Sequence, residues 1–286
     1  MTTAPIANTL MRVAVPSKGR LREQTIELLR QAGYRVSRGA NASKLAEGIE
    51  FIEMRPRDAA AWLRAGRLDA AFISTDTALE NEIESWPTIG LGFAKSDLVV
   101  ACREDEPWTG ADDLAGKTVA THLPAWTERF FAERDIDATV VSMGGALEGV
   151  CAVGLADAIV DLRETGGSLS RNHLRVLETV QGCQASFVTS PDANVDVINL
   201  MSLRITAALN ARRTQYVMLH IDADRVIDLS KVFPGLDSPT VLPLAGRTDR
   251  VAAHMVIDKN ELWMRLQELR DLGADAIVAL PTDAIL

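Results

Sequence analysis

Short apolar runs alternate with amphipathic stretches over the first two thirds of the chain, and this alternation limits the fold more than any other feature. Residues 12–15 have the pattern of a strand, and residues 20–32 have that of a helix with one apolar face. Gly33 stands where a helix C-terminal cap belongs. Strand 51–54, helix 57–65 and strand 69–74 continue the pattern. The alternation predicts an α/β fold with parallel sheets covered by helices.

A second block of the same kind begins near Lys95. Two α/β lobes in series predict a ligand cleft between them, because ligands bind at domain interfaces and beyond the carboxyl ends of strands. The predicted elements of this block are strands 97–102, 117–121, 138–143 and 158–162, helix 125–134 and a short helix after Gly144.

From residue 211 the pattern changes to βαββαβ, the order of a ferredoxin-like (ACT-like) module. Strands are predicted at 214–221, 239–244, 250–257 and 275–280, with helices at 224–233 and 259–272. No evident catalytic residues lie here, so we expect a regulatory or oligomerising role. The domains expected are a disordered lead-in at 1–10, lobe I at 11–95 and 180–210, lobe II at 96–179 and the C-terminal domain at 211–286.

Composition argues against several classes of function. The net charge of −9 speaks against a nucleic-acid partner, whose binding surface would be basic. No apolar stretch reaches the ~20 residues of a membrane span, and the first residues lack the features of a secretory signal. The three cysteines match neither a disulfide framework nor a zinc site, so we expect reduced thiols in a cytoplasmic protein without a membrane partner.

Two candidate site stretches stand where a predicted strand meets a predicted helix. In the first, at 15–20, Lys18, Gly19 and Arg20 form an anion site if the helix N-terminus presents its N–H groups, although a solvated turn fits equally well. In the second, at 54–58, Arg55 and the following Pro56 begin a helix, and the guanidinium is suited to clamp a phosphate.

The third stretch is the loop 164–168, which follows the strand carrying Asp157 and Asp161. Small residues let backbone amides approach a phosphate, yet the glycine spacing matches neither a Walker A loop nor a dinucleotide fingerprint. The two carboxylates could hold ribose hydroxyls or a magnesium ion. The loop residues are Glu164, Thr165, Gly166, Gly167 and Ser168.

No hydrolase constellation accompanies these stretches. The histidines have neither a metal-ligand spacing nor an evident nucleophile partner, so we interpret each as a surface or packing residue. They are His122, His173, His220 and His254.

Taken together, the stretches resemble the long form of the ATP phosphoribosyltransferase family, the first enzyme of histidine biosynthesis. The resemblance covers nearly the whole chain from Met11, and the ordered set of segments is far more specific than any one of them. These segments are VPSKGRL, RPRDAAAWLRAGRLDAAF, ADAIVDLRETGGSL, RITAALNARRTQYVML and PGLDSPTVLPL. The resemblance implies two periplasmic-binding-protein-like lobes and a regulatory domain that binds histidine, in a homo-oligomer that is a dimer or a hexamer.

The resemblance also implies roles for the candidate residues. The loop 164–168 would bind the 5′-phosphate of phosphoribosyl pyrophosphate (PRPP), Asp157 and Asp161 would face its ribose, and Lys18, Gly19 and Arg20 would approach its pyrophosphate. Lys18, Asp157 and Asp161 are the expected catalytic residues. Mg²⁺ is expected as the cofactor, bound mainly through PRPP, with its protein ligands left open. The residues expected to contact the acceptor, ATP, are Arg55, Pro56, Asp76, Thr121 and Leu123.

The chain departs from the family pattern on the acceptor side. Where the family usually has Gly-Ile-Val/Thr-Gly-Lys/Arg-Asp, this chain has Ala-Phe-Ile-Ser-Thr-Asp at 71–76, and Leu123 stands where the family often has Tyr. A side chain at a former glycine narrows the approach to a ligand. These changes leave open a related transferase with another nitrogen heterocycle as acceptor. A non-catalytic regulatory subunit is a third hypothesis, which the retained loop 164–168 disfavours.

The resemblance places the contacts to the effector, histidine, in the C-terminal domain. The family usually has Asp or Asn at the position of His220, and an acidic side chain would accept from the ammonium or imidazole of the effector. His220 removes that charge, so weak inhibition is predicted, unless His220 points into the domain core. The expected effector contacts are His220, Leu236, Ser238, Pro239 and Thr240.

Overall fold

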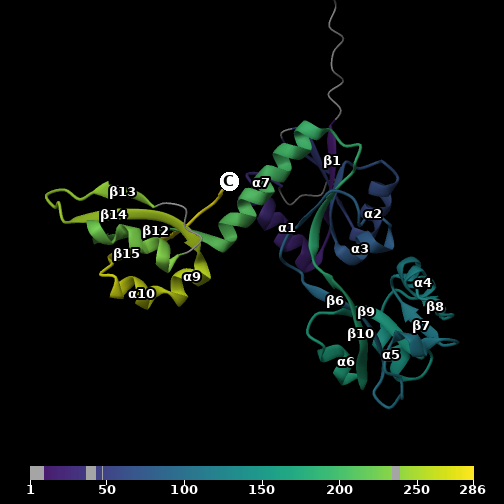
Figure 1. Ribbon diagram of the computed structural model, residues 1–286. Coiled ribbons are helices and arrows are strands. Elements are labelled where there is room, and N and C mark those ends of the chain that lie inside the picture. Colours follow the sequence, from purple (N-terminus) through teal and green to yellow (C-terminus); the bar gives the residue numbers. More distant parts are fainter. Residues whose placement is uncertain (1–9, 37–42, 47, 234–238) are drawn as a thin grey trace, which may run out of the picture. The chain divides into compact units, whose positions relative to one another are not determined.

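The computed structural model describes residues 10–36, 43–46, 48–233 and 239–286 (Figure 1). The expected lead-in therefore lies outside the described residues, apart from Leu10. The chain divides into two compact units, Met1–Glu27 with Arg35–Asn199 and Leu28–Tyr34 with Leu200–Leu286. The first unit holds two sheets and the second holds a third. The predicted α/β class, with two lobes and a C-terminal module, is confirmed.

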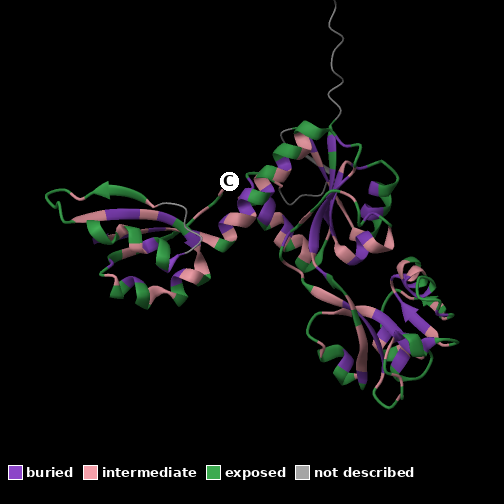
Figure 2. Cartoon of the chain, viewed as in Figure 1, coloured by how far each residue is buried: buried purple, intermediate pink, exposed green. Residues whose placement is uncertain are grey.

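The sheet of lobe I has the strand order β2-β3-β1-β4-β11-β5. Phe51, Phe72 and Phe187 are at most 1% exposed and fill its core. Its central strands are buried on both faces because helices cover the sheet (Figure 2). The elements are β1 (Met11–Pro16), α1 (Gly19–Gln31), β2 (Ser43–Ala46), β3 (Ile49–Met54), α2 (Pro56–Arg64), β4 (Ala70–Ser74), α3 (Thr75–Glu80), β5 (Thr88–Gly90) and β11 (Ala185–Thr189).

The sheet of lobe II has the strand order β10-β6-β9-β7-β8. Its core includes Leu98, Val100, Phe131 and Val160, which are at most 2% exposed. The elements are β6 (Ser96–Arg103), the 3₁₀ helix η1 (Ala111–Leu114), β7 (Thr118–Thr121), α4 (Pro124–Ala132), β8 (Thr139–Ser142), α5 (Leu147–Ala152), β9 (Ala158–Arg163), α6 (Gly167–Arg171) and β10 (Leu174–Cys183).

The prediction of parallel sheets is wrong in part. Strands β1, β3 and β4 are parallel in lobe I, as are β7, β8 and β9 in lobe II. However, β11 runs antiparallel to β4, and β6 runs antiparallel to β9. The chain leaves lobe I between β5 and β6 and returns to it between β10 and β11. Strands β6 and β11 therefore enter their sheets from the other lobe and not through a helical crossover, which is the connection that makes strands parallel. The sequence analysis missed β2, β5, β10, β11, α3 and the long helix α7 (Val195–Arg213).

The strand directions place the ends of neighbouring strands together. In lobe I, the turns after β1, β3 and β4 lie at one edge of the sheet, since these strands are parallel neighbours. In lobe II, the turns after β7 and β9 share an edge for the same reason. These edges are where open α/β sheets bind ligands.

The third sheet has the strand order β13-β14-β12-β15, antiparallel throughout, which is the ferredoxin-like arrangement. Burial alternates along β12, so Val217, Leu219 and Ile221 face the helices and the residues between them face outward. The elements are β12 (Thr214–Asp222), η2 (Ala223–Asp228), α8 (Leu229–Val232), β13 (Thr240–Pro243), β14 (Arg250–Asp258), α9 (Lys259–Met264), α10 (Leu266–Asp271) and β15 (Asp275–Pro281). The two helices predicted here are each divided, the second at Arg265.

Across the described parts of the chain, no helix combines the length and the apolar character that a bilayer crossing requires.

Candidate active site

The first two predicted stretches lie side by side at the carboxyl edge of the lobe I sheet. Pro16 and Met54 are register partners, and Ser17 N donates to Met54 O at 2.9 Å. Gly19 has a φ of +77°, a left-handed backbone that favours glycine. Lys18, Gly19 and Arg20 are exposed. The turn after β1 therefore presents two cations next to the start of α2.

Arg55 and Pro56 begin helix α2 at this edge. Arg55 is its extended N-cap residue, and Pro56 occupies the first helical position, where its missing N–H costs nothing. The Arg55 side chain is exposed, as expected of a residue that is to contact a ligand.

Asp76 follows β4 at the same edge and is 5% exposed. Thr77 Oγ1 lies 3.4 Å from its Oδ2, but its Oδ1 has no hydrogen-bond partner among the described residues. A buried carboxylate oxygen without a partner is costly, and ligand binding can remove that cost. Asp76 is therefore the acceptor-side candidate with the strongest structural support.

The loop 164–168 joins β9 to helix α6 in lobe II. Gly166 has a φ of +78° and precedes the first helical residue, Gly167. The first N–H groups of α6 have no partner within the helix. A cavity of about 260 Å³ opens here, lined by the loop together with Glu148 and Arg171. Ser168 Oγ donates to Glu148 Oε1 at 2.5 Å, so the two side chains are joined at the cavity wall.

The first and third stretches meet across the two lobes. Arg20 Nη2 lies 3.4 Å from Glu164 Oε2, and both side chains are about 60% exposed. An exposed pair of this kind adds little stability. The pair does show that the turn after β1 lies beside the loop after β9.

Asp161 lies near the carboxyl end of β9, close to the loop. Its Oδ1 accepts from the backbone N–H of Leu162 at 2.7 Å and lies 3.2 Å from His122 Nδ1. The sequence analysis interpreted His122 as a surface or packing residue, and the structure places its side chain against this carboxylate. Arg57 also donates to the carbonyl of His122, which links α2 of lobe I to lobe II.

Asp157 does not join Asp161 at the site. It precedes β9, and its Oδ2 accepts from the backbone N–H of Thr118 at 2.9 Å. Three residues of β9 lie between the two, and the rise along a strand puts their Cα atoms about 13 Å apart. The expectation that both face the ribose is wrong, because one lies before the strand and the other near its carboxyl end.

The side chains of Thr121 and Leu123 are both buried inside lobe II. Thr121 is fully buried, and its hydroxyl donates to Val160 O at 2.9 Å and accepts from Leu123 N at 3.0 Å. Leu123 is 1% exposed and packs in the core of lobe II. Their expected acceptor contacts are therefore wrong for the side chains, which anchor the turn before α4.

The altered segment 71–76 is mostly a packing change. Ala71 is fully buried in the lobe I core, so it narrows no ligand approach. Ser74 Oγ lies 3.1 Å from Thr77 Oγ1. Thr75 Oγ1 donates to Gln184 O and accepts from Gln184 N, both at 3.2 Å, which ties α3 to the returning segment between lobes.

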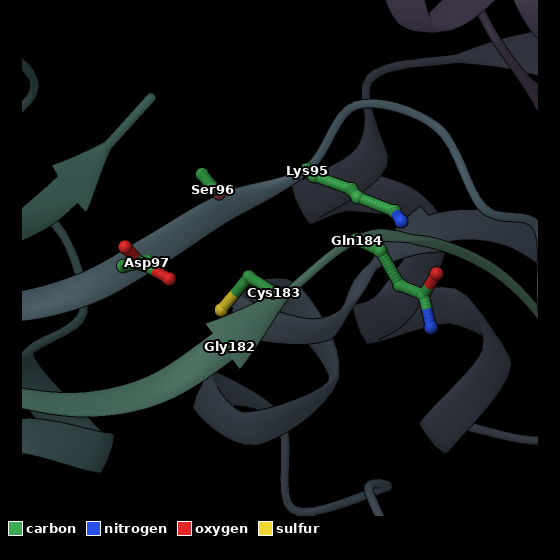
Figure 3. Close-up of a pocket in the computed structure, with 6 residues that line it drawn as sticks. All are labelled: Lys95, Ser96, Asp97, Gly182, Cys183 and Gln184. Carbon is green, nitrogen blue, oxygen red and sulfur yellow. The ribbon is translucent and has the colours of Figure 1, made fainter. Parts of the chain in front are cut away.

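A second cavity, of about 340 Å³, lies between the two segments that connect the lobes (Figure 3). Lys95, Ser96 and Asp97 come from the outgoing segment, and the facing wall is Gly182, Cys183 and Gln184. None of the predicted site residues lines it. Burial raises the pKa of Cys183 to about 12, and the charge of nearby Asp76 acts in the same direction. Cys183 is therefore a neutral thiol and no nucleophile.

The predicted effector residues fall partly outside the described residues, as Leu236 and Ser238 do. Thr240 and Pro239 lie at the start of β13, and Thr240 pairs with His254 in register. His220 lies on the outward face of β12, between the buried Leu219 and Ile221. The alternative that His220 points into the domain core is wrong.

The sequence analysis missed three residues of these edges: His122, Glu148 and Glu80. Glu80 of lobe I accepts from the N–H groups of Ala125 and Trp126 at 3.1 and 2.9 Å, at the N-terminus of α4. Their contacts span 20 to 46 residues, and no local pattern marks them. The one available signal for His122 is its position directly after a strand.

The chain matches two protein families over most of its length. The family described as HisG, ATP phosphoribosyltransferase, matches residues 55–207, and the family described as HisG, C-terminal domain, matches residues 211–284. A protein named ATP phosphoribosyltransferase from Methanococcoides burtonii is 31% identical over 283 residues, covering 97% of this chain and 100% of that protein. One of the same name from Parabacteroides distasonis is 32% identical with the same coverage.

Among solved structures, the ATP phosphoribosyl transferase (HisG:HisZ) complex from Thermotoga maritima contains a similar chain. Its TM-score is 0.59 at 26% identity, and the match covers 68% of this chain and 98% of that one.

Proposed function

This chain belongs to the ATP phosphoribosyltransferase family in its long form, and on that premise we propose how its residues catalyse the first step of histidine biosynthesis. The reaction joins ATP to PRPP and gives N1-(5-phosphoribosyl)-ATP and pyrophosphate. The observation that supports this assignment of the site is the 3.4 Å contact between Arg20 and Glu164, which brings the cationic turn to the glycine-containing loop.

The groups at the two edges match the charges of this reaction. Displacement at C1 of the ribose builds cationic character on the sugar and negative charge on the departing pyrophosphate. Asp161 is placed to stabilise the first, and Lys18 with Arg20 the second, as fixed charges. The adenine N1 brings its own lone pair, so no strong general base is required.

The loop 164–168 is proposed as the 5′-phosphate site. The first N–H groups of α6 and the hydroxyls of Thr165 and Ser168 supply donors, and Arg171 supplies charge at the cavity wall. Glu148, on the same cavity wall, accepts from Ser168. Its carboxylate is an acceptor, which suits a ribose hydroxyl better than a phosphate.

Mg²⁺ is the proposed cofactor. Among the described residues, no group of three or more His, Cys, Asp or Glu side chains is arranged to hold a metal ion. Mg²⁺ usually binds through one or two carboxylates together with substrate phosphates, so the residues present fit an ion that arrives with PRPP. When bound, it supplies positive charge to the departing pyrophosphate. Full turnover in excess chelator would contradict this assignment.

ATP is supported as the acceptor by the packing of the altered segment. Of the departures that suggested another heterocycle, Ala71 and Leu123 are buried in cores. Thr75, in place of the basic residue, bonds to Gln184, and Ser74, in place of the second glycine, is half-buried at the end of β4. Asp76 keeps its place beside the turn, with one oxygen unpaired among described residues. The test is a panel of nitrogen heterocycles incubated with PRPP and Mg²⁺, read by pyrophosphate release. Turnover with another acceptor but not with ATP would overturn the assignment.

A binding measurement tests the loop separately. Thr165→Ala with Ser168→Ala removes donors to a charged phosphate, and each lost bond costs about 1.5–3 kcal/mol of PRPP affinity. Ser170→Ala is the matched control, since Ser170 lies exposed on the same helix. Calorimetry that shows equal PRPP affinity in the folded double variant and the control would rule out the loop as the phosphate site.

The assembly is proposed to be a homo-oligomer, a dimer or a hexamer, that works in the cytoplasm. The outward face of the third sheet supports this, because Val256 of β14 and Val278 and Leu280 of β15, the strands on either side of β12, are 40–52% exposed. Mass measurement in solution tests it, and a monomer at micromolar concentration would contradict it.

A further inference from the structure

His122 and Asp161 are brought together by neighbouring strands of lobe II. Thr121, the last residue of β7, is the register partner of Val160 on β9, so the residues that follow each lie side by side. His122 Nδ1 lies 3.2 Å from Asp161 Oδ1, and each side chain is 19% exposed. The pair is therefore mostly shielded from water but open on one side.

The contact fixes one carboxylate oxygen and leaves the other available. A carboxylate only accepts, so an attractive contact requires the proton on Nδ1 of His122. Oδ1 of Asp161 then accepts from the backbone N–H of Leu162 and lies within ion-pair distance of the imidazole. In the described part of the chain, Oδ2 of Asp161 has no such partner. The arrangement holds the carboxylate in one orientation.

We propose that His122 is a positioning residue that orients Asp161 so that Oδ2 faces the ribose of PRPP. This inference rests on the proposed function, in which Asp161 stabilises the cationic sugar. Fixed orientation matters for such a charge, because an electrostatic contribution to the transition state depends on a preorganised carboxylate.

The backbone around His122 is itself held from three sides. The hydroxyl of Thr127 lies 3.3 Å from that of Thr121, the residue before His122. Arg57 of α2 donates to the His122 carbonyl. Glu80 of α3 accepts from the N–H group of Trp126, at the start of α4. The charged residues in these contacts around His122 are thus Asp161, Arg57 and Glu80. Replacing the His122 side chain leaves all the backbone contacts in place, so a substitution there tests the imidazole alone.

Steady-state kinetics with PRPP and ATP is the first test. His122→Ala should lower kcat by roughly ten- to a hundred-fold, the loss expected for one bond to a charged group. The KM for PRPP should change far less, because the imidazole does not contact substrate. His122→Asn, whose amide can take the place of Nδ1–H, should recover most of the rate. A change confined to KM, or no recovery in His122→Asn, would overturn the proposal.

A double-mutant cycle separates action through Asp161 from other effects. If His122 works by orienting Asp161, adding His122→Ala to Asp161→Asn should change kcat by less than about twofold. A full additional loss in that background would show an independent role and sink the inference. His173→Asn is the control, because His173 also lies beside a carboxylate, Glu104 at 3.9 Å, but is 88% exposed. It should keep the wild-type rate.

Nitrogen-15 spectroscopy of the imidazole tests the contact without turnover. The proposal expects the proton on Nδ1 of His122 and a changed signal in Asp161→Asn. A proton on Nε2 instead would overturn it, whether or not ATP is the acceptor. Absence of wild-type turnover with every acceptor would count against the proposed function, and the spectrum would still decide the positioning contact.

Discussion

The three cysteine thiols are shielded by burial in the cores of the first unit. Burial raises the pKa of Cys151 to about 11 and that of Cys183 to about 12, and it also raises the pKa of Cys102. At pH 8 the thiolate fraction at Cys151 is then about one in a thousand. We expect no alkylation by iodoacetamide at pH 8 in the native protein and full reaction after unfolding. Rapid labelling of the folded chain would contradict the burial.

The same pKa shifts set the direction of an alkaline effect. Because the folded pKa values lie above the ordinary value of 9.0, the folded state keeps its thiol protons where the unfolded state has lost them. The stabilising contribution is complete below pH 9 and declines as the pH rises toward 12.

Gly166 is required by backbone conformation rather than by space. Its φ of +78° lies in the left-handed region, and an added Cβ would meet only Arg163 Cδ at 3.8 Å. Gly166→Ala should therefore lower the free energy of unfolding by about 1–2 kcal/mol, and Gly166→Asn by less. Gly167→Ala is the control, since its Cβ would meet Thr165 Oγ1 at an ordinary 3.8 Å. Equal urea midpoints for Gly166→Ala and Gly167→Ala would refute the argument.

Residue types in the sequence singled out the loop 164–168 and the turn at Lys18 as candidates, and the structure brings the two stretches within 3.4 Å of each other. Residue types alone predicted ligand contacts for Leu123 and Asp157 that the structure does not support, because residue identity does not determine the direction of a side chain. Leu123 turns into the core, and Asp157 stands before its strand rather than after it. His122 escaped notice because its partner is 39 positions away.

At the scale of elements, helix α4 lacks a cap from its own chain segment. Leu123 is its N-cap residue and makes no side-chain cap bond. Glu80 of α3 instead accepts from Ala125 N and Trp126 N. The carboxylate also complements the positive end of the helix dipole. One side chain of lobe I thus completes a helix of lobe II.

Removing this cap should weaken both α4 and the junction of the lobes. Glu80→Ala leaves two N–H groups unpaired and should cost about 1–3 kcal/mol of unfolding free energy. Hydrogen exchange at the amides of Ala125 and Trp126 should accelerate by the factor that corresponds to this loss of free energy. Glu84→Ala, at an exposed position four residues on, is the control and should change neither. Unchanged exchange in Glu80→Ala would show that the cap is not formed in solution.

Strongly periodic elements such as β1, α1, β7 and β9 follow from the sequence because their apolar spacing reports a buried face. Strands β5 and β10 did not, since β5 is three residues long and largely exposed. β10 is half-buried with two register irregularities against β6, which break its alternation. Strand direction was the larger error, because direction depends on which strands pair and no local pattern carries that information.

At the scale of the whole molecule, the order of the lobes and the C-terminal module could be predicted from the sequence. The exact division into two compact units could not. The change of pattern near 211 marks the C-terminal module, and the matched family segment 211–284 begins there. The compact unit that contains it also takes in Leu28–Tyr34, at the end of α1. That grouping depends on contacts between distant segments, which composition does not reveal.

The last prediction concerns control of the transferase by histidine through the C-terminal module. His220 lies outward on β12, and the guanidinium of Arg250 donates to its carbonyl at 3.2 Å, so the strand is held while the imidazole stays accessible. The resemblance implies an Asp or Asn at this position in the family, and an Asp there would give the effector a charge-assisted bond of about 1.5–3 kcal/mol. Its absence should weaken inhibition ten- to a hundred-fold. His220→Asp should therefore strengthen inhibition by that factor, whereas His220→Asn, of the same shape without the charge, should not. Inhibition constants from initial rates decide the matter, and low-micromolar inhibition of the wild-type chain would refute this role for His220.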